Sequence, residues 1–217
     1  MPAPGGRRLN TALKTALKIN EGEKMIAFGP VPSRRLGRSL GINNIPAKIC
    51  TYSCAYCQVG RTMQMEVKRR SYYSPQEIWQ EVKAKVDSSR SQGLAIDYLT
   101  FVPDGEPTLD INLGQEIDML RPLGIKIAVI SNASLIWDEN VREELSKADW
   151  VSVKVDALDE HIWRRMDRPH RALGQQAILQ GILDFSKVFK GMLVTESILL
   201  EGINDDESTL LGMEEFL

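Results

Sequence analysis

The sequence predicts an α/β protein whose parallel strands form a partial (β/α) barrel of about five to six β/α units. Short apolar runs rich in Val, Ile and Leu alternate with longer segments of helical periodicity, an order that favours parallel strands with right-handed crossovers. No Gly-x-Gly-x-x-Gly motif opens a helix after any of these runs, which argues against an open dinucleotide-binding sheet. Polar residues instead follow several runs, at the strand ends where barrel enzymes place their chemistry.

The strands are predicted from apolar runs that are short and bounded by polar or turn-forming residues, as buried parallel strands are. They are Leu40–Ile45, Tyr98–Val102, Ile125–Ile130, Val151–Val155 and Met192–Leu200.

The first helix is marked by the segment Ser74-Pro75-Gln76-Glu77, a capping box with proline at the first helical position. Ile78, Val82 and Val86 follow at intervals of four residues and form an apolar stripe. Further helices are predicted over Leu113–Leu120, Glu139–Ser146, Leu173–Lys187 and Glu207–Leu217.

Length and composition indicate one sizeable domain. The chain has 217 residues, 43% of them hydrophobic, and a formal net charge of −2, which argues against a generally basic surface for nucleic acid. Residues 1–24 are polar and marked by Gly and Pro, and we interpret them as an N-terminal extension before a core domain over residues 25–217. No apolar run approaches the ~18 residues of a membrane span, and no secretory signal is recognisable, so we expect a cytoplasmic protein without membrane contact.

The C-terminal segment predicts an incomplete core. Leu210, Leu211 and Phe216 form an apolar stripe with no later strand to cover it. Two interpretations are open: the core domain is truncated at its C-terminus, or it is a natural short form of the core.

All three cysteines lie together as Cys50, Cys54 and Cys57, a C-x₃-C-x₂-C spacing in a segment that reads as a loop. Three readings are open: small apolar residues of the core, a zinc site, and an iron–sulfur cluster. A structural zinc site takes four ligands, and the two histidines, His161 and His170, lie more than a hundred residues away. A cubane cluster also takes four thiolates as a rule, so three cysteines would leave one iron for a ligand from outside the chain.

This spacing, with aromatic Tyr56 before the last cysteine, resembles the signature of the radical S-adenosylmethionine (radical SAM) superfamily. The resemblance implies a [4Fe–4S] cluster on Cys50, Cys54 and Cys57 and SAM on the fourth iron. The reduced cluster would cleave SAM to methionine and a 5′-deoxyadenosyl radical, which abstracts a substrate hydrogen. Such an oxidoreductase also needs a reducing electron donor, which we expect to be flavodoxin- or ferredoxin-like.

Two later strand ends resemble further motifs of the family. Asp104-Gly105-Glu106-Pro107 is similar to its Gly-Gly-Glu-Pro motif, which implies contacts to the SAM ammonium. This chain departs from the motif at the first glycine, where it has Asp104. An aspartate reaches the tighter turn conformations less readily than a glycine does. Ser131 and Asn132 resemble a Thr-Asn-Gly site near the SAM ribose and carboxylate.

The alternation of residues in the predicted strand over Val151–Val155 indicates one polar face, independently of any family resemblance. The period of two puts three valines on one face and Ser152, Lys154 and Asp156 on the other. A polar inner face is unfavourable in a dry core, so these three residues either line a wet cavity, where the family resemblance implies contacts to the cofactor, or belong to an exposed edge strand, which alternates in the same way. Lys154 also resembles a basic residue that some family members direct at the SAM carboxylate.

The upstream segment 28–38 resembles a subgroup related to wybutosine-type tRNA-modifying enzymes. Those enzymes carry additional cysteines for a second cluster, which this chain lacks, so the likeness does not transfer their activity. The substrate stays open between RNA or a nucleotide and a partner enzyme. Two other classes remain alongside a radical SAM enzyme: a non-catalytic iron–sulfur protein for electron transfer or sensing, and a zinc-binding interaction module.

Overall fold

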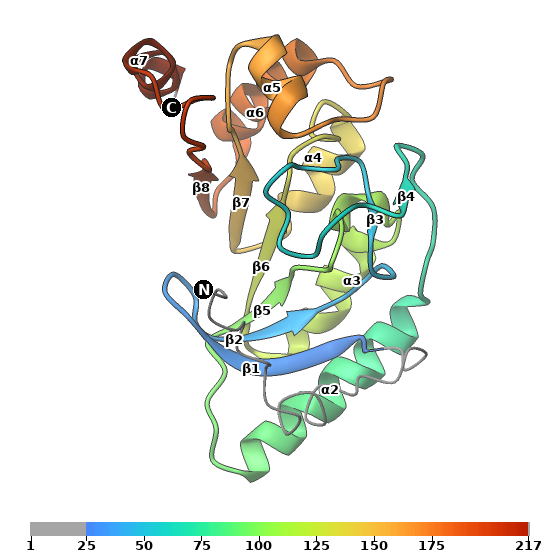
Figure 1. Cartoon of the computed structure of the whole chain (residues 1–217). Coiled ribbons are helices and arrows are strands. Elements are labelled where there is room, and N and C mark those ends of the chain that lie inside the picture. Colours follow the sequence, from blue (N-terminus) through green and yellow to red (C-terminus); the bar gives the residue numbers. More distant parts are fainter. Residues whose placement is uncertain (1–24, 217) are drawn as a thin grey trace, which may run out of the picture.

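The computed structural model describes residues 25–216, so the predicted extension 1–24 and the terminal Leu217 lie outside the described residues. Its main sheet has six strands in the order β1-β2-β5-β6-β7-β8 (Figure 1). The strands from β2 to β8 are parallel and β1 is antiparallel to β2, which confirms the predicted α/β class. The bounds are β1 (Ala27–Ser33), β2 (Gly37–Ile42), β5 (Tyr98–Phe101), β6 (Lys126–Ser131), β7 (Trp150–Lys154) and β8 (Met192–Glu196).

Helices join the parallel strands. The predicted capping box is present, because the Ser74 hydroxyl accepts a hydrogen bond from the Glu77 N–H while the Glu77 carboxylate accepts one from the Ser74 N–H. The helices are α2 (Pro75–Ser91), α3 (Leu113–Leu120), α4 (Glu139–Leu145), α5 (Glu160–Met166), α6 (Gln175–Val188) and α7 (Glu207–Phe216), with 3₁₀ turns over Pro107–Leu109 and Arg121–Leu123.

Besides two strands of two residues each and the 3₁₀ turns, strand β1 and helix α5 were not expected from the sequence. Strand β1 contains Pro30 and Pro32, which removes two backbone donors. An edge strand tolerates this, because its outer side forms no ladder hydrogen bonds. Helix α5 has only seven residues and buries only Trp163 and Met166, too short a stripe to show a helical period.

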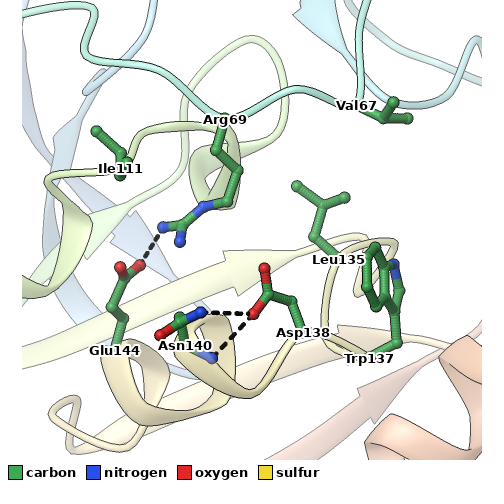
Figure 2. A pocket seen from close by; sticks show the side chains of 8 residues that line it. All are labelled: Val67, Arg69, Ile111, Leu135, Trp137, Asp138, Asn140 and Glu144. Atoms are coloured by element: carbon green, nitrogen blue, oxygen red, sulfur yellow. Dashed lines mark hydrogen bonds and ion pairs between the residues drawn. The ribbon is translucent and has the colours of Figure 1, made fainter.

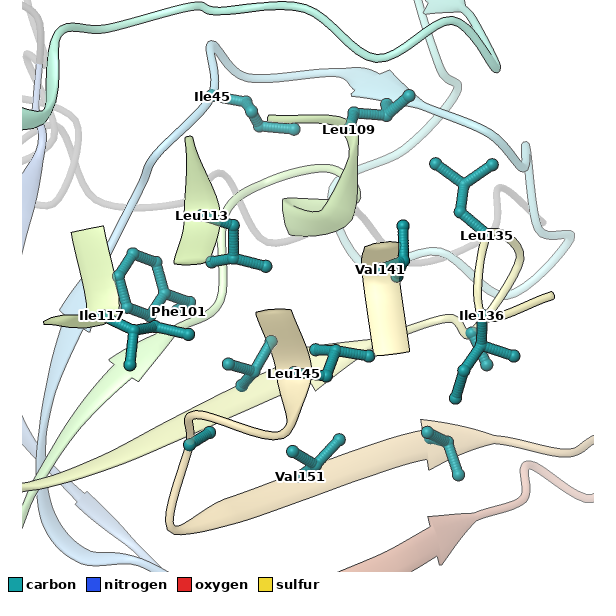
Figure 3. Packing of buried hydrophobic residues seen from close by; sticks show 14 of the residues in the cluster. Ile45, Phe101, Leu109, Leu113, Ile117, Leu135, Ile136, Val141, Leu145 and Val151 are labelled. Carbon is teal, nitrogen blue, oxygen red and sulfur yellow. The ribbon is translucent and has the colours of Figure 1, made fainter. Parts of the chain in front are cut away.

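The main core lies between the sheet and helices α2, α3, α4 and α6, and Figure 3 shows the part that involves α3 and α4. Leu113 and Ile117 of α3 and Leu145 of α4 are fully buried against sheet residues Phe101 and Val151. Each such side chain stabilises the fold by about 1.5–3 kcal/mol relative to an exposed position.

A smaller cluster shows that the sheet curves. Leu36, in the turn between β1 and β2, packs with Ala128 of β6 and Trp150 of β7. In the same turn, Arg35 forms an ion pair with Glu196 of β8. The hairpin at one edge of the sheet therefore contacts the strand at the other edge, as a partial barrel requires.

The cysteine segment forms a loop across the carboxyl ends of the strands (Figure 1). Short strands β3 (Ile49–Cys50) and β4 (Gln64–Met65) pair in parallel and close this loop, which we call the cluster loop (residues 50–65). Its backbone forms hydrogen bonds to the C-terminal end of α5 and to the segment that follows α5. Ala55 N–H donates to the Met166 carbonyl at 2.7 Å, and His170 N–H donates to the Thr51 carbonyl at 2.9 Å. Over residues 25–216, no helix combines the length and apolar character that a membrane crossing needs.

Candidate cluster and cofactor site

A cavity of about 450 Å³ opens at the carboxyl ends of β5, β6, β7 and β8, below the cluster loop. A volume of this size is typical of sites for small ligands. Nine of the twelve residues predicted to bind a cluster or cofactor line it: Cys50, Cys54, Tyr56, Cys57, Gly105, Glu106, Ser131, Asn132 and Lys154. The other three, Asp104, Ser152 and Asp156, do not line it.

The three thiols share this cavity and a second one of about 200 Å³ beside it. All are free and half-buried. Burial, and then the nearby Glu106 carboxylate, raise the pKa of Cys50 to about 12, and burial also raises the pKa of Cys54. A metal binds the deprotonated thiolate, so binding of cationic iron would lower the pKa values of these thiols and release their protons.

The arrangement fits a cluster better than a single ion. Among residues 25–216, no three side chains of His, Cys, Asp or Glu converge closely enough to hold one metal ion. In a cubane each thiolate binds a different iron, so three thiols spaced around one cavity suit it, and three are what the chain has.

Tyr56 is fixed as one wall of the cavity. Its hydroxyl donates to the Asp167 carboxylate at 2.6 Å and also to Asp156, while the Lys154 ammonium lies 4.9 Å from its ring centroid. The Cys54 thiol donates to the same Asp167 oxygen at 3.4 Å. Burial, followed by the charge of the neighbouring Asp156, raises the pKa of Asp167 above its usual range.

Two predicted residues of β7 and its end lie away from the cavity wall. Ser152 is 1% exposed and Asp156 is 2% exposed. Asp156 is used internally, since it accepts hydrogen bonds from Tyr56 and from the Ile198 N–H at 2.7 Å. The expectation of a fully wet polar face is therefore wrong for these two positions: below Lys154 the barrel interior is closed by packed side chains such as Trp150.

Glu106 joins the ends of β5 and β6. It is 1% exposed and accepts hydrogen bonds from the Thr108 hydroxyl at 2.6 Å, the Ser131 hydroxyl at 2.8 Å and the Asn132 N–H at 2.7 Å. Burial raises its pKa, and these donors oppose that rise. The Glu106 carboxylate thus connects the loop after β5 to the loop after β6, and these hydrogen bonds occupy much of its acceptor capacity.

Gly105 lies against the cluster loop. A Cβ atom at this position would overlap the Ile49 carbonyl oxygen and would lie 2.9 Å from the Ile45 side chain. The same Ile49 carbonyl accepts the Glu106 N–H at 3.2 Å. Glycine is required here because two backbone segments approach each other closely.

Asn132 connects β6 to the cluster loop. Its side-chain amide donates to the Thr51 hydroxyl at 2.8 Å and to the Cys50 sulfur at 3.5 Å. The predicted strand-end residues therefore converge on the cysteine segment, although more than 80 residues separate Asn132 from Cys50.

Sequence reasoning missed several residues of the cavity. Glu196 is opposite Lys154 in the β7–β8 ladder and brings a carboxylate, paired with Arg35, to the cavity wall. The sequence did not mark Glu196 as a strand-end residue, because the predicted strand extended to Leu200, whereas β8 ends at Glu196. The other missed lining residues are Gln58, Val102, Pro103, Ile130 and Ile198.

A separate cavity of about 500 Å³ lies beside Arg69 (Figure 2). The Arg69 guanidinium donates to the Thr108 carbonyl at 2.8 Å and the Asp110 carbonyl at 2.9 Å. It also pairs with Glu144 of α4. Arg69 thus ties the segment after the cluster loop to the loop after Glu106.

Free thiols on one loop, above a cavity at the carboxyl ends of parallel strands, define the class of an iron–sulfur enzyme with a small-molecule cofactor. A family model described as the Radical SAM superfamily matches residues 44–211. The chain belongs to the radical SAM superfamily. Membership implies a SAM-cleaving enzyme with a [4Fe–4S] cluster.

A protein of known sequence is similar to this chain over most of its length. The chain is 52% identical to UPF0026 protein MJ1312 from Methanocaldococcus jannaschii over 192 residues, which cover 88% of this chain and 59% of that protein. The chain thus spans about 60% of the length of this relative.

Two solved structures share the fold. One is a structure of TYW1 with a lysine–pyruvate adduct bound (TM-score 0.61, 21% identity, covering 82% of this chain and 61% of that chain). The other is a radical SAM methyltransferase from Sphaerobacter thermophilus (TM-score 0.64, 14% identity, covering 82% and 53%). These likenesses confirm the partial barrel expected from the sequence.

Proposed function

We propose that this chain binds a [4Fe–4S] cluster through Cys50, Cys54 and Cys57 and holds SAM in the adjoining cavity, as the catalytic core of a hydrogen-abstracting enzyme. The observation that carries the proposal is that the three thiols share one cavity with Glu106 and Lys154. When bound and reduced, the cluster supplies the electron that cleaves SAM to methionine and a 5′-deoxyadenosyl radical.

The charged residues of the cavity suit the two ends of an amino-acid group. The Lys154 ammonium, held above the Tyr56 ring, would pair with a carboxylate. Backbone carbonyls beside Gly105 and the Glu106 carboxylate would accept hydrogen bonds from an ammonium. Ile130 and Ile198 give the cavity apolar surface for a ring or a methylene chain.

The test is anaerobic reconstitution with iron and sulfide, followed by EPR spectroscopy of the dithionite-reduced protein with and without SAM and by measurement of 5′-deoxyadenosine. We expect a [4Fe–4S]⁺ signal that shifts on addition of SAM, with slow product formation. Cys54→Ser should lose the signal and most of the iron, whereas Ser53→Ala, at the neighbouring position, should retain both.

Other results would contradict the proposal. Zinc without acid-labile sulfide would indicate an interaction module. A cluster signal that SAM leaves unchanged would indicate an electron carrier or sensor.

A further inference from the structure

The cluster loop has an outer side as well as the side that faces the SAM cavity. A cavity of about 570 Å³ opens on this outer side, and Cys54 and Cys57 line it together with Arg61, Met63 and Arg168. The same two cysteines line the cavity at the strand ends. An iron–sulfur group held by these thiols would therefore be approached from two different directions.

The outer side exposes methionine. Met63 is 82% exposed and Met65 is 38% exposed, and both line the outer cavity. Exposed apolar side chains grouped at a cavity indicate a contact with another molecule. Methionine is flexible and polarizable, and it is favoured where a surface adapts to a partner.

The charge of this side is positive. The charged residues that line the outer cavity are Arg61 and Arg168, both exposed, and neither forms an ion pair with another residue of the described range 25–216. Two acidic residues are close to these arginines in the sequence, and each already has a partner. Glu66, near Arg61, forms an ion pair with Arg70, and Asp167, next to Arg168, is buried and hydrogen-bonded to Tyr56. The positive charge is thus available to an acidic partner.

We propose that this surface, formed by Arg61, Met63, Met65 and Arg168 and named here the Met63 surface, docks an acidic redox protein that delivers electrons to the cluster. The inference rests on the proposed function. In each encounter one electron passes from the reduced prosthetic group of the partner to the oxidised cluster, and no atom is transferred. The partner is oxidised by one electron and the cluster is reduced by one.

The position of the surface separates this partner from the substrate. The substrate carbon must meet the radical on the cavity side, where Lys154 and Glu196 lie, and the cluster loop stands between that side and the Met63 surface. An electron only needs proximity to the cluster. Redox encounters are typically small and weak and are guided by charge, and a few exposed methionines flanked by two arginines match that kind of contact.

The experiment measures the rate of cluster reduction in the reconstituted protein by photoreduced flavodoxin as the acidic probe, in stopped flow at low and high ionic strength. Dithionite, a small reductant, serves as the comparison. The variants are Arg61→Glu with Arg168→Glu, and separately Met63→Ala. The control is Lys126→Glu with Lys190→Glu, which makes the same change in net charge at exposed positions away from the cluster loop. Circular dichroism and iron content check that each variant folds and loads.

We expect the double arginine variant to be reduced by flavodoxin about tenfold more slowly at low ionic strength and to lose most of its salt dependence. Reduction by dithionite should stay within about twofold of the wild type. The Met63→Ala variant should be slowed at both ionic strengths, and the lysine control should behave as the wild type does.

Two results would overturn the inference. In the first, flavodoxin reduces the arginine variant at the wild-type rate. In the second, the variant loses binding of a labelled RNA in a filter assay while its reduction by flavodoxin is unchanged, so that the surface serves nucleic acid. Failure of the proposed function is recognised separately, because dithionite would then produce no cluster signal in the wild type.

Discussion

Glu116 offers a direct test of the electrostatics of the core. It lies on α3 with 0% exposure, and neither of its carboxylate oxygens has a hydrogen-bond partner among the described residues. Burial, and then the charges of Asp110 and Glu144, raise its pKa from 4.5 to about 9, while Asn44 offsets part of the rise. The carboxyl group is therefore protonated at neutral pH in the folded protein.

This shift makes stability depend on pH in a defined direction. Below pH 4.5 the group is protonated in both states, so it contributes no pH dependence. Between pH 4.5 and 9 the unfolded chain loses the proton and the folded chain keeps it, so the free energy of unfolding falls as pH rises. At ~1.4 kcal/mol per pH unit, the loss between pH 4.5 and 7 is about 3 kcal/mol.

The substitution Glu116→Gln keeps the shape and removes the titration. Relative to the wild type, it should gain about 3 kcal/mol between pH 4.5 and 7, measured as the free energy of unfolding from urea titrations followed by circular dichroism at several pH values. Glu81→Gln, an exposed position on α2, is the control and should show no such gain. Parallel stability curves for Glu116→Gln and the wild type would refute the reasoning, because they would mean that Glu116 is ionised in the folded protein.

Three further predictions concern the cluster loop and its supports. Gly105→Ala should displace the Ile49 carbonyl, destabilise the fold by about 1–3 kcal/mol and lower the iron content after reconstitution, whereas Gly212→Ala in α7, where an added Cβ would meet only the Leu158 side chain at 3.9 Å, should do neither. Arg69→Met should lower the free energy of unfolding in urea by about 1–3 kcal/mol, because it leaves the half-buried Glu144 without this ion pair and the Thr108 and Asp110 carbonyls without a donor; an unchanged urea midpoint would contradict this. Tyr56→Phe should cost about 1–3 kcal/mol, because two buried carboxylates lose a donor; wild-type stability would show that water replaces it.

The local features of this protein could be predicted from its sequence. The C-x₃-C-x₂-C segment, the Gly105–Glu106 turn and the capping box at Ser74 each depend on a few consecutive residues, and the structure brings the strand-end residues together because parallel strands place their carboxyl ends at one edge. The helix over Leu113–Leu120 was predicted with its observed bounds.

The long-range contacts could not be predicted. The Tyr56–Asp167 hydrogen bond joins residues 111 positions apart, and the Arg35–Glu196 ion pair joins the two edges of the sheet. No period or spacing in a single sequence encodes such pairs. They depend on the curvature of the sheet, which brings the first hairpin to the last strand, and on the short helix α5, which carries Asp167 to the cluster loop.

The aspartate at the first glycine of the Gly-Gly-Glu-Pro motif is compatible with the site. Asp104 does not have a positive φ, so it adopts a conformation that suits any residue. Its side chain is exposed, and its carbonyl accepts the Lys48 N–H at 2.6 Å, which fixes the start of the cluster loop. Its hydrogen-bond partner Lys48, in the segment before the cluster loop, is the residue that has the left-handed conformation, with φ 64°. The backbone of Asp104 therefore supports the cluster loop as a glycine would, while Gly105 remains the position that admits no side chain.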